Sequence, residues 1–167
     1  SLKIEGRMKT ALYVATVART YRRAIDDYLK DPGLYQKHMD WYREQIRSCS
    51  YRQYSTGFFF GKPSEEDQIY EENSYVRGAT YLGQVQKIRE DGTFLIEQKN
   101  KFCLGDSIEI MKPNGDNVEV TVTSITDSEG KPQESCPHSR QMIWIGVDGG
   151  TVDQYDILRR QEEAREG

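Results

Sequence analysis

The sequence is poor in the residues that build disulfide and metal sites. It has three cysteines, at positions 49, 103 and 136, and two histidines, at 38 and 138. The cysteines are odd in number, widely spaced and without a C-x-x-C pair, which argues against a disulfide scaffold and against a zinc finger. Cys136 and His138 are near neighbours, but they supply only two of the four ligands of a structural zinc site. We therefore expect no metal site and a reducing compartment.

Long apolar runs and export signals are also missing. No stretch approaches 18 apolar residues, so we expect no membrane span. The start of the chain lacks the charged-then-apolar pattern of a secretion signal, so we expect a cytoplasmic location. The motifs G-x-S-x-G, H-E-x-x-H, Walker A and G-x-G-x-x-G do not occur. The sequence thus predicts no complete active site in this chain.

Charge and aromatic residues divide the chain near residue 62. Residues 1–62 carry 12 Lys/Arg against 6 Asp/Glu, whereas residues 63–167 carry 11 against 21. Eleven of the 18 Phe, Trp and Tyr residues also lie in the first 62 positions. The two halves differ in the sign of their net charge and in aromatic content, which indicates two structural units.

The first unit is predicted to be helical. Apolar residues from Thr10 to Lys30 recur at spacings of three and four, with Thr10 placed to cap the helix. Asp31 then caps a second predicted helix, from Pro32 to about Ser48, because proline is tolerated in the first helical turn. Four tyrosines fall seven residues apart across these segments. The break between the helices favours coincidence over a coiled-coil seam.

From Gly78 onward the pattern changes to short segments with alternating burial, separated by turn residues such as Asp91-Gly92. Such segments predict a small closed or sandwiched all-β domain. Residues 63–75 are polar and acidic and are interpreted as a linker, and Tyr155 to Glu166 are predicted to form a short terminal helix. The predicted strands are 79–90, 93–98, 106–112, 118–126 and 141–146.

The first unit contains the motifs KIEGRMK at Lys3–Lys9, YVATV at Tyr13–Val17 and YSTGF at Tyr54–Phe58. These motifs resemble peptidase family U32, the collagenase-like proteases: the first two resemble the end of that family's catalytic-domain segment, and the third resembles a following element. The stretch Ile96–Phe102 (IEQKNKF) and the later Asp156–Arg160 (DILRR) resemble its C-terminal domain. These matches keep their order over nearly the whole chain.

The resemblance implies that a large β/α-barrel domain precedes this chain. Leu2–Gly6 would then be its last strand, with Glu5 and Arg7 at the rim of its active site, because such sites lie at the carboxyl ends of the strands. Arg7 could hold a substrate carboxylate or phosphate in a bidentate fork. A structural ion pair between Arg7 and Glu5 is the alternative. Some family members are implied to hydroxylate RNA bases with an iron–sulphur cluster, whose cysteines would lie in the upstream domain; no cofactor is expected in this chain.

The fold class expected is α+β: a helical tail of a β/α barrel at 1–62, a linker at 63–77, a small all-β barrel at 78–160 and a frayed tail at 161–167. The leading hypothesis is an accessory, non-catalytic module that positions substrate or packs between domains. The partners implied are the missing barrel domain and a peptide or RNA substrate, with self-association through Phe58–Phe60 as a further hypothesis.

The alternative hypothesis is an RNA-binding module of a base-hydroxylating enzyme. Basic side chains neutralise phosphates and aromatic rings stack on unpaired bases, and the first unit is rich in both. Two solvated amphipathic helices would show the same composition. Because the second unit is acidic, any RNA contact is expected on the first unit, at Arg22, Arg23 and Arg52.

Overall fold

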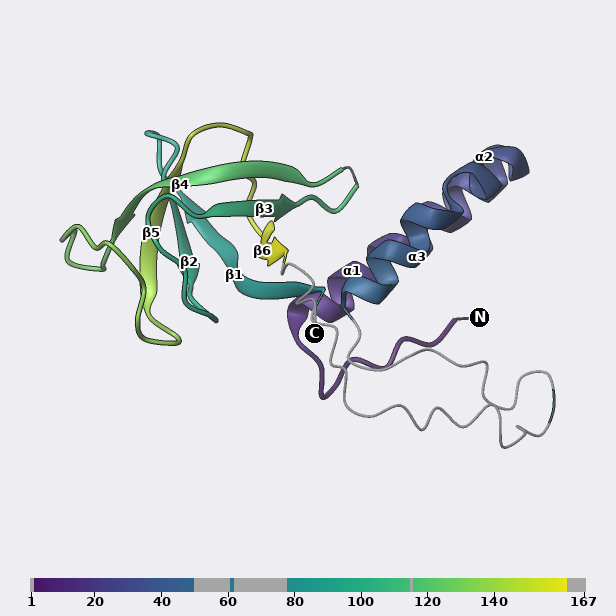
Figure 1. The fold of residues 1–167 in the computed structure, drawn as a ribbon, viewed down its shortest axis with the longest axis horizontal. Coiled ribbons are helices and arrows are strands. Elements are labelled where there is room, and N and C mark those ends of the chain that lie inside the picture. Colours follow the sequence, from purple (N-terminus) through teal and green to yellow (C-terminus); the bar gives the residue numbers. More distant parts are fainter. Residues whose placement is uncertain (1, 50–60, 62–77, 115, 162–167) are drawn as a thin grey trace, which may run out of the picture.

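The structure is a computed structural model that describes residues 2–49, 61, 78–114 and 116–161. A helical hairpin lies at one end and a β-barrel at the other (Figure 1). This arrangement confirms the α+β class. Among the described residues, every helix is too short or too polar to cross a bilayer. The predicted linker at 63–77 lies outside the described residues, as does the predicted tail at 161–167 except for Gln161, which ends a strand.

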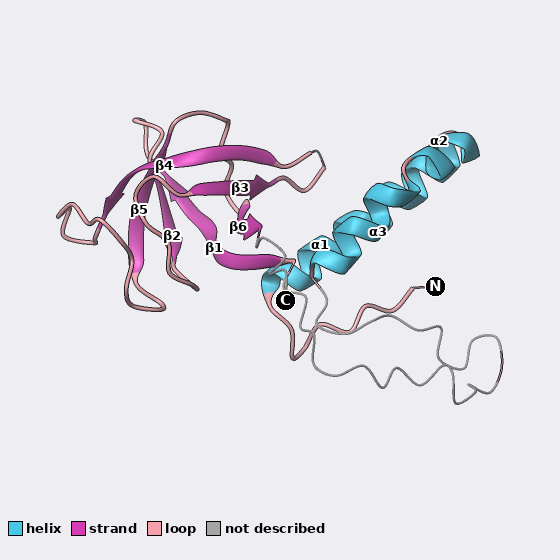
Figure 2. Cartoon of the chain, in the orientation of Figure 1, coloured by secondary structure: helices cyan, strands magenta, loops and turns pink. Residues whose placement is uncertain are grey.

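Helix α1 (Ala11–Lys30) matches its prediction, and the Thr10 hydroxyl caps it by accepting from the Tyr13 N–H at 3.2 Å. The predicted second helix is divided into α2 (Pro32–Lys37) and α3 (Met39–Ser48). The division falls at His38, whose backbone leaves helical geometry (φ −94°, ψ 7°) and whose ring Nδ1 lies 2.8 Å from the Asp27 carboxylate. The side chain therefore ties the hairpin's return segment to α1 at the point where the helix is interrupted. Helices α1 and α3 lie side by side (Figure 2).

Six antiparallel strands close into a barrel in the order β1-β2-β5-β4-β3-β6, with β6 paired to β1. Closure leaves no unpaired sheet edge. Each of the five strands expected from alternation is present. The bounds are β1 (Ala79–Ile88), β2 (Phe94–Glu97), β3 (Ser107–Met111), β4 (Val118–Thr126), β5 (Met142–Val147) and β6 (Ile157–Gln161).

The prediction of a terminal helix from Tyr155 was wrong, because this segment forms β6. Three consecutive residues of β6 are buried. Ile157 packs beside α1, Leu158 points into the barrel core and Arg159 is buried near the helices. A strand covered on both faces shows no alternation in its sequence. The charged residues that follow it in the sequence are typical of the end of a helix, which favoured the wrong prediction.

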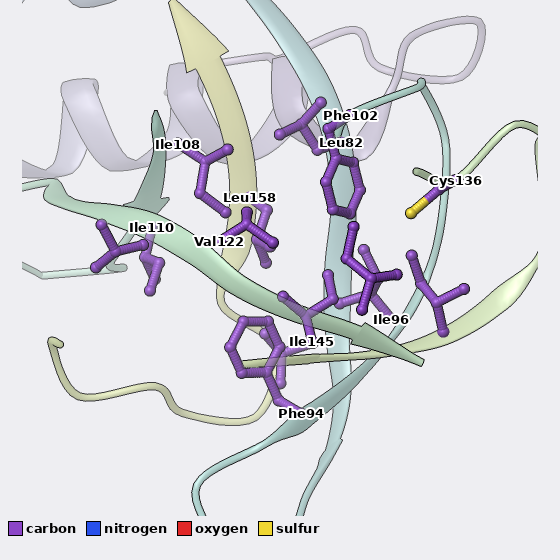
Figure 3. Packing of buried hydrophobic residues seen from close by; sticks show 14 residues of the cluster. Leu82, Phe94, Ile96, Phe102, Ile108, Ile110, Val122, Cys136, Ile145 and Leu158 are labelled. Carbon is purple, nitrogen blue, oxygen red and sulfur yellow. The ribbon is translucent and has the colours of Figure 1, made fainter. Parts of the chain in front are cut away.

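The barrel core is one contiguous cluster of aliphatic and aromatic side chains. Figure 3 shows Phe94, Phe102 and Ile145 in this cluster, each contributed by a different segment. Cys136 is 1% exposed and belongs to the same cluster, where it packs as a small apolar residue.

The helices and the barrel are joined by buried polar side chains. Gln45 Oε1 in α3 accepts from Arg19 of α1 at 2.8 Å and from Arg159 of β6 at 3.4 Å. Arg159 Nε also donates to Glu109 of β3 at 2.7 Å. Arg19 and Arg159 are only 7% and 1% exposed. Burial, and then the nearby charge of Arg159, lower the pKa of Arg19 to about 10. We call Arg19, Gln45, Glu109 and Arg159 the junction cluster.

Candidate functional site

A hollow of about 830 Å³ lies where the start of α1, the end of α3 and the strands β1 and β2 meet. It is lined by residues from both structural units, so its shape depends on the junction cluster that joins them. Its lining is mixed in character, with lysines, amides, tyrosines and one carboxylate. The lining residues used below are Lys9, Tyr13, Tyr81, Gln86, Glu97, Lys99 and Asn100.

On the helical side, the hollow faces the amino end of α1. The positive end of the helix dipole lies there, and it favours negatively charged groups. Lys9 adds a full positive charge, with its Nζ 5.3 Å from the centre of the Tyr13 ring. The side of the hollow formed by α1 therefore favours an anion.

On the barrel side, Lys99 Nζ donates to Glu97 Oε1 at 2.8 Å, and this hydrogen bond lowers the pKa of Glu97. Asn100 Nδ2 donates to the Tyr81 carbonyl at 2.7 Å. Burial, and next the Glu97 charge, raise the pKa of the Tyr81 phenol, which stays a neutral hydrogen-bonding group. These groups can bind amides, hydroxyls and phosphates.

Glu5 and Arg7 lie just ahead of the hollow in sequence, but they are turned toward each other. Glu5 Oε1 accepts from the Arg7 backbone N–H at 3.0 Å, and the two side chains approach to 3.9 Å. Both side chains are exposed. Leu2–Gly6 has no strand partner among the described residues. The predicted substrate contact of Arg7 therefore remains a prediction, beside the ion pair that the structure shows.

The arginines expected to contact RNA have protein partners. Arg22 forms an ion pair with Asp26 one turn later on α1. Arg23 donates to Asp116 at 3.0 Å, and its guanidinium lies 4.3 Å from the centre of the Trp41 ring. Arg52 lies outside the described residues. Neither Arg22 nor Arg23 lines the hollow, and their role in RNA binding stays a prediction.

The part of the chain that the structure describes holds no group of three or more His, Cys, Asp and Glu that could bind a metal ion. Burial raises the pKa of Cys136 to about 12, so its thiol is neutral and a poor nucleophile. An iron–sulphur cluster needs several thiolates close together, and Cys136 in the barrel core cannot supply one.

Comparisons with known proteins identify the family. Residues 1–69 match the family model described as "Peptidase family U32", and residues 77–159 match "Peptidase family U32 C-terminal domain". The chain belongs to peptidase family U32. The U32 resemblance of its motifs is thereby confirmed, and the second match ends within β6.

Two curated relatives within the family carry names that refer to tRNA. The chain is 35% identical over 89% of its length to tRNA hydroxylation protein P1 of Bacillus subtilis, and 30% identical over 96% to tRNA hydroxylation protein P of Escherichia coli. It spans about a third of the length of each, namely 35% and 34%. A solved C-terminal domain from a Geobacillus thermoleovorans protein described as a U32 peptidase is 23% identical, with a TM-score of 0.44, and the match covers 48% of this chain and 99% of that domain.

Proposed function

We propose that this chain is the C-terminal module of a tRNA-hydroxylating U32 protein, and that the hollow contacts the tRNA. The observation that carries the proposal is the identity of 35% and 30% to two proteins named for tRNA hydroxylation, over nearly the whole chain. Because the chain spans a third of those proteins, catalysis itself is assigned to the region outside it.

The position of the hollow supports a role beside an active site. In a β/α barrel, the catalytic face carries the carboxyl ends of the strands and hence the amino ends of the helices. If α1 follows the last strand of such a barrel, its amino end opens on that face. The hollow, with Lys9 and Lys99 in its walls, would then lie beside the reacting base and hold adjacent phosphates.

The outer face of the helical hairpin supports the presence of an upstream domain. Tyr21, Ile25, Tyr28 and Leu29 of α1 are exposed. A groove of about 460 Å³ on the hairpin is lined mostly by apolar and aromatic residues of α1, α2 and α3, together with Thr20, Arg43 and Arg47. Exposed apolar surfaces of this kind mark interaction sites. We assign the upstream barrel domain as the occupant, since two thirds of the relatives' length lies outside the matched region.

The proposal is tested by tRNA binding with the full-length protein. The variant Lys9→Ala/Lys99→Ala removes both cations of the hollow. Its matched control, Lys30→Ala/Lys37→Ala, removes two exposed lysines from the opposite end of the hairpin. We expect the hollow variant to bind tRNA at least tenfold more weakly at 100 mM salt and the control to bind within twofold of the parent. Equal affinity of both variants would refute the role of the hollow.

A peptidase function has less support in the described residues. The family name is its main argument, since no nucleophile–base pair accompanies it: Cys136 is buried and its pKa is raised to about 12, while His138 lies on the exposed side of the loop that follows. The comparisons favour tRNA as the substrate over a peptide.

A further inference from the structure

A stacked pair of side chains lies on the outside of the barrel, in the acidic half of the sequence. The guanidinium carbon of Arg89 is 3.6 Å from the centre of the Trp144 ring. Arg89 is exposed at the end of β1, and Trp144 is half-buried in β5. The distance places the guanidinium in contact with the ring face. One side of the guanidinium thus rests on the ring, while Arg89 remains exposed to solvent.

Strand register places a further cation beside this pair. Leu95 of β2 is the register partner of Trp144 on one side and of Lys87 of β1 on the other. Residues paired across neighbouring strands share one face of the sheet. Lys87, Leu95 and Trp144 therefore form a row across β1, β2 and β5, with Arg89 lying over the tryptophan. We call these four residues the outer-face row.

The two cations of this row have no direct ion pair among the described residues, although Asp91 lies near enough for its charge to interact with that of Arg89. Neither Lys87 nor Arg89 forms an ion pair with any residue that the structure describes, in contrast to Arg159 and Arg160, which both do. In the adjoining turn, Glu90 is exposed, and Asp91 accepts hydrogen bonds from the Thr93 N–H and hydroxyl at 2.9 and 2.7 Å. An unpaired guanidinium held over an indole can stack on a base and donate to a phosphate.

The outer-face row is continuous with the hollow. Gln86, which precedes Lys87 on β1, lines the hollow, as does Glu97, two residues beyond Leu95 on β2. Two residues of a strand span about 7 Å, which is close to the phosphate spacing of an extended RNA strand. A single RNA strand that enters the hollow can therefore reach the row without leaving the surface of the barrel.

Resting on the function proposed above, we propose that the outer face of β1, β2 and β5 binds an unpaired stretch of the tRNA. A base stacks on the solvent side of the Arg89 guanidinium, which Trp144 supports from beneath, and Lys87 contacts a neighbouring phosphate. The RNA contact thus lies on the acidic second unit, where the sequence did not lead us to expect it. Salt screens the carboxylates that lie more than about 8–10 Å from the row.

The test is tRNA affinity, measured by fluorescence anisotropy with the full-length protein over a range of salt concentrations. Arg89→Ala should weaken binding about tenfold, because the base loses the planar surface on which it stacks. Arg89→Lys keeps the positive charge but loses the planar guanidinium, and it should still weaken binding several-fold. Lys87→Ala should reduce the slope of log affinity against log salt by about 0.7 to 0.9. The control Lys30→Ala should bind within twofold of the parent.

The outcomes separate this inference from the proposed function. If the parent binds tRNA and the Lys9→Ala/Lys99→Ala variant is impaired, but all three row variants bind within twofold, the outer-face row is refuted and the proposed function stands. If Arg89→Lys binds as the parent does, stacking is refuted. If the parent does not bind tRNA, both proposals fail. Circular dichroism checks that each variant keeps its fold, as expected for exposed side chains.

Discussion

Removing the charge of Glu109 should destabilise the joint between helices and barrel. Its Oε2 atom accepts from Arg159 Nε at 2.7 Å and from Gln161 Nε2 at 3.0 Å. Arg159 is 1% exposed and lies in the same cluster as the buried Arg19. In Glu109→Gln, two buried guanidiniums would remain without that carboxylate, and the new amide would offer only one acceptor oxygen.

The magnitude follows from this geometry. Breaking a buried ion pair from one side typically costs 3–5 kcal/mol. Because the Glu109 side chain is 22% exposed and glutamine retains one acceptor, we expect the lower end, about 3 kcal/mol. For a domain of this size that corresponds to a fall in Tm of about 6–12 °C.

Urea unfolding followed by circular dichroism measures this loss, with Glu119→Gln as the matched control. Glu119 is the exposed register partner of Glu109 on β4 and accepts a hydrogen bond from the Ser107 hydroxyl. Its substitution should change the free energy of unfolding by less than about 0.5 kcal/mol. If the two substitutions cost the same, the charge of the junction cluster does not hold the units together.

Three further predictions concern other parts of the fold. Gly78→Ala should lower the free energy of unfolding by about 1–3 kcal/mol, because an added Cβ would lie 2.4 Å from a backbone atom at the end of α3. Gly149→Ala is the control and should leave stability unchanged, because nothing lies within 4 Å of its added Cβ. Thermal melts compare the two variants. Hydrogen bonds, first from His38, lower the pKa of Asp27 below its ordinary value of 3.8. The ionised carboxylate therefore stabilises the fold above pH 3.8, and this contribution is lost as the pH falls through the lowered pKa. Asp27→Asn should therefore flatten the decline of the unfolding free energy below about pH 4, and an unchanged acid titration would contradict this. Cys136 should resist a thiol reagent at pH 8 in the native state and react once unfolded, and rapid native labelling would contradict its burial.

The elements with local signals could be predicted from the sequence. Thr10 and Asp31 cap the helices as their residue types suggest. Five strands follow from alternation and turn residues. The sixth strand could not be predicted, because both faces of Ile157–Arg159 are covered and the alternation that marks a strand is lost. Only the pairing with β1 and β3 reveals it.

The site depended on contacts between residues far apart in sequence. Arg23 looks like a phosphate ligand until the fold brings it to Trp41 and to Asp116, 93 positions away. Arg89 and Trp144 are likewise joined only through the register of β1, β2 and β5. Composition located the positive charge of the chain, but register and packing decide which cations remain available to a ligand.

The most direct test of the account is nucleoside mass spectrometry on tRNA from cells in which the gene for this protein is deleted. The account predicts that a hydroxylated nucleoside disappears from the tRNA. The full-length parent protein should restore it, whereas the Lys9→Ala/Lys99→Ala variant should restore it poorly. An unchanged nucleoside profile after deletion would contradict the central claim.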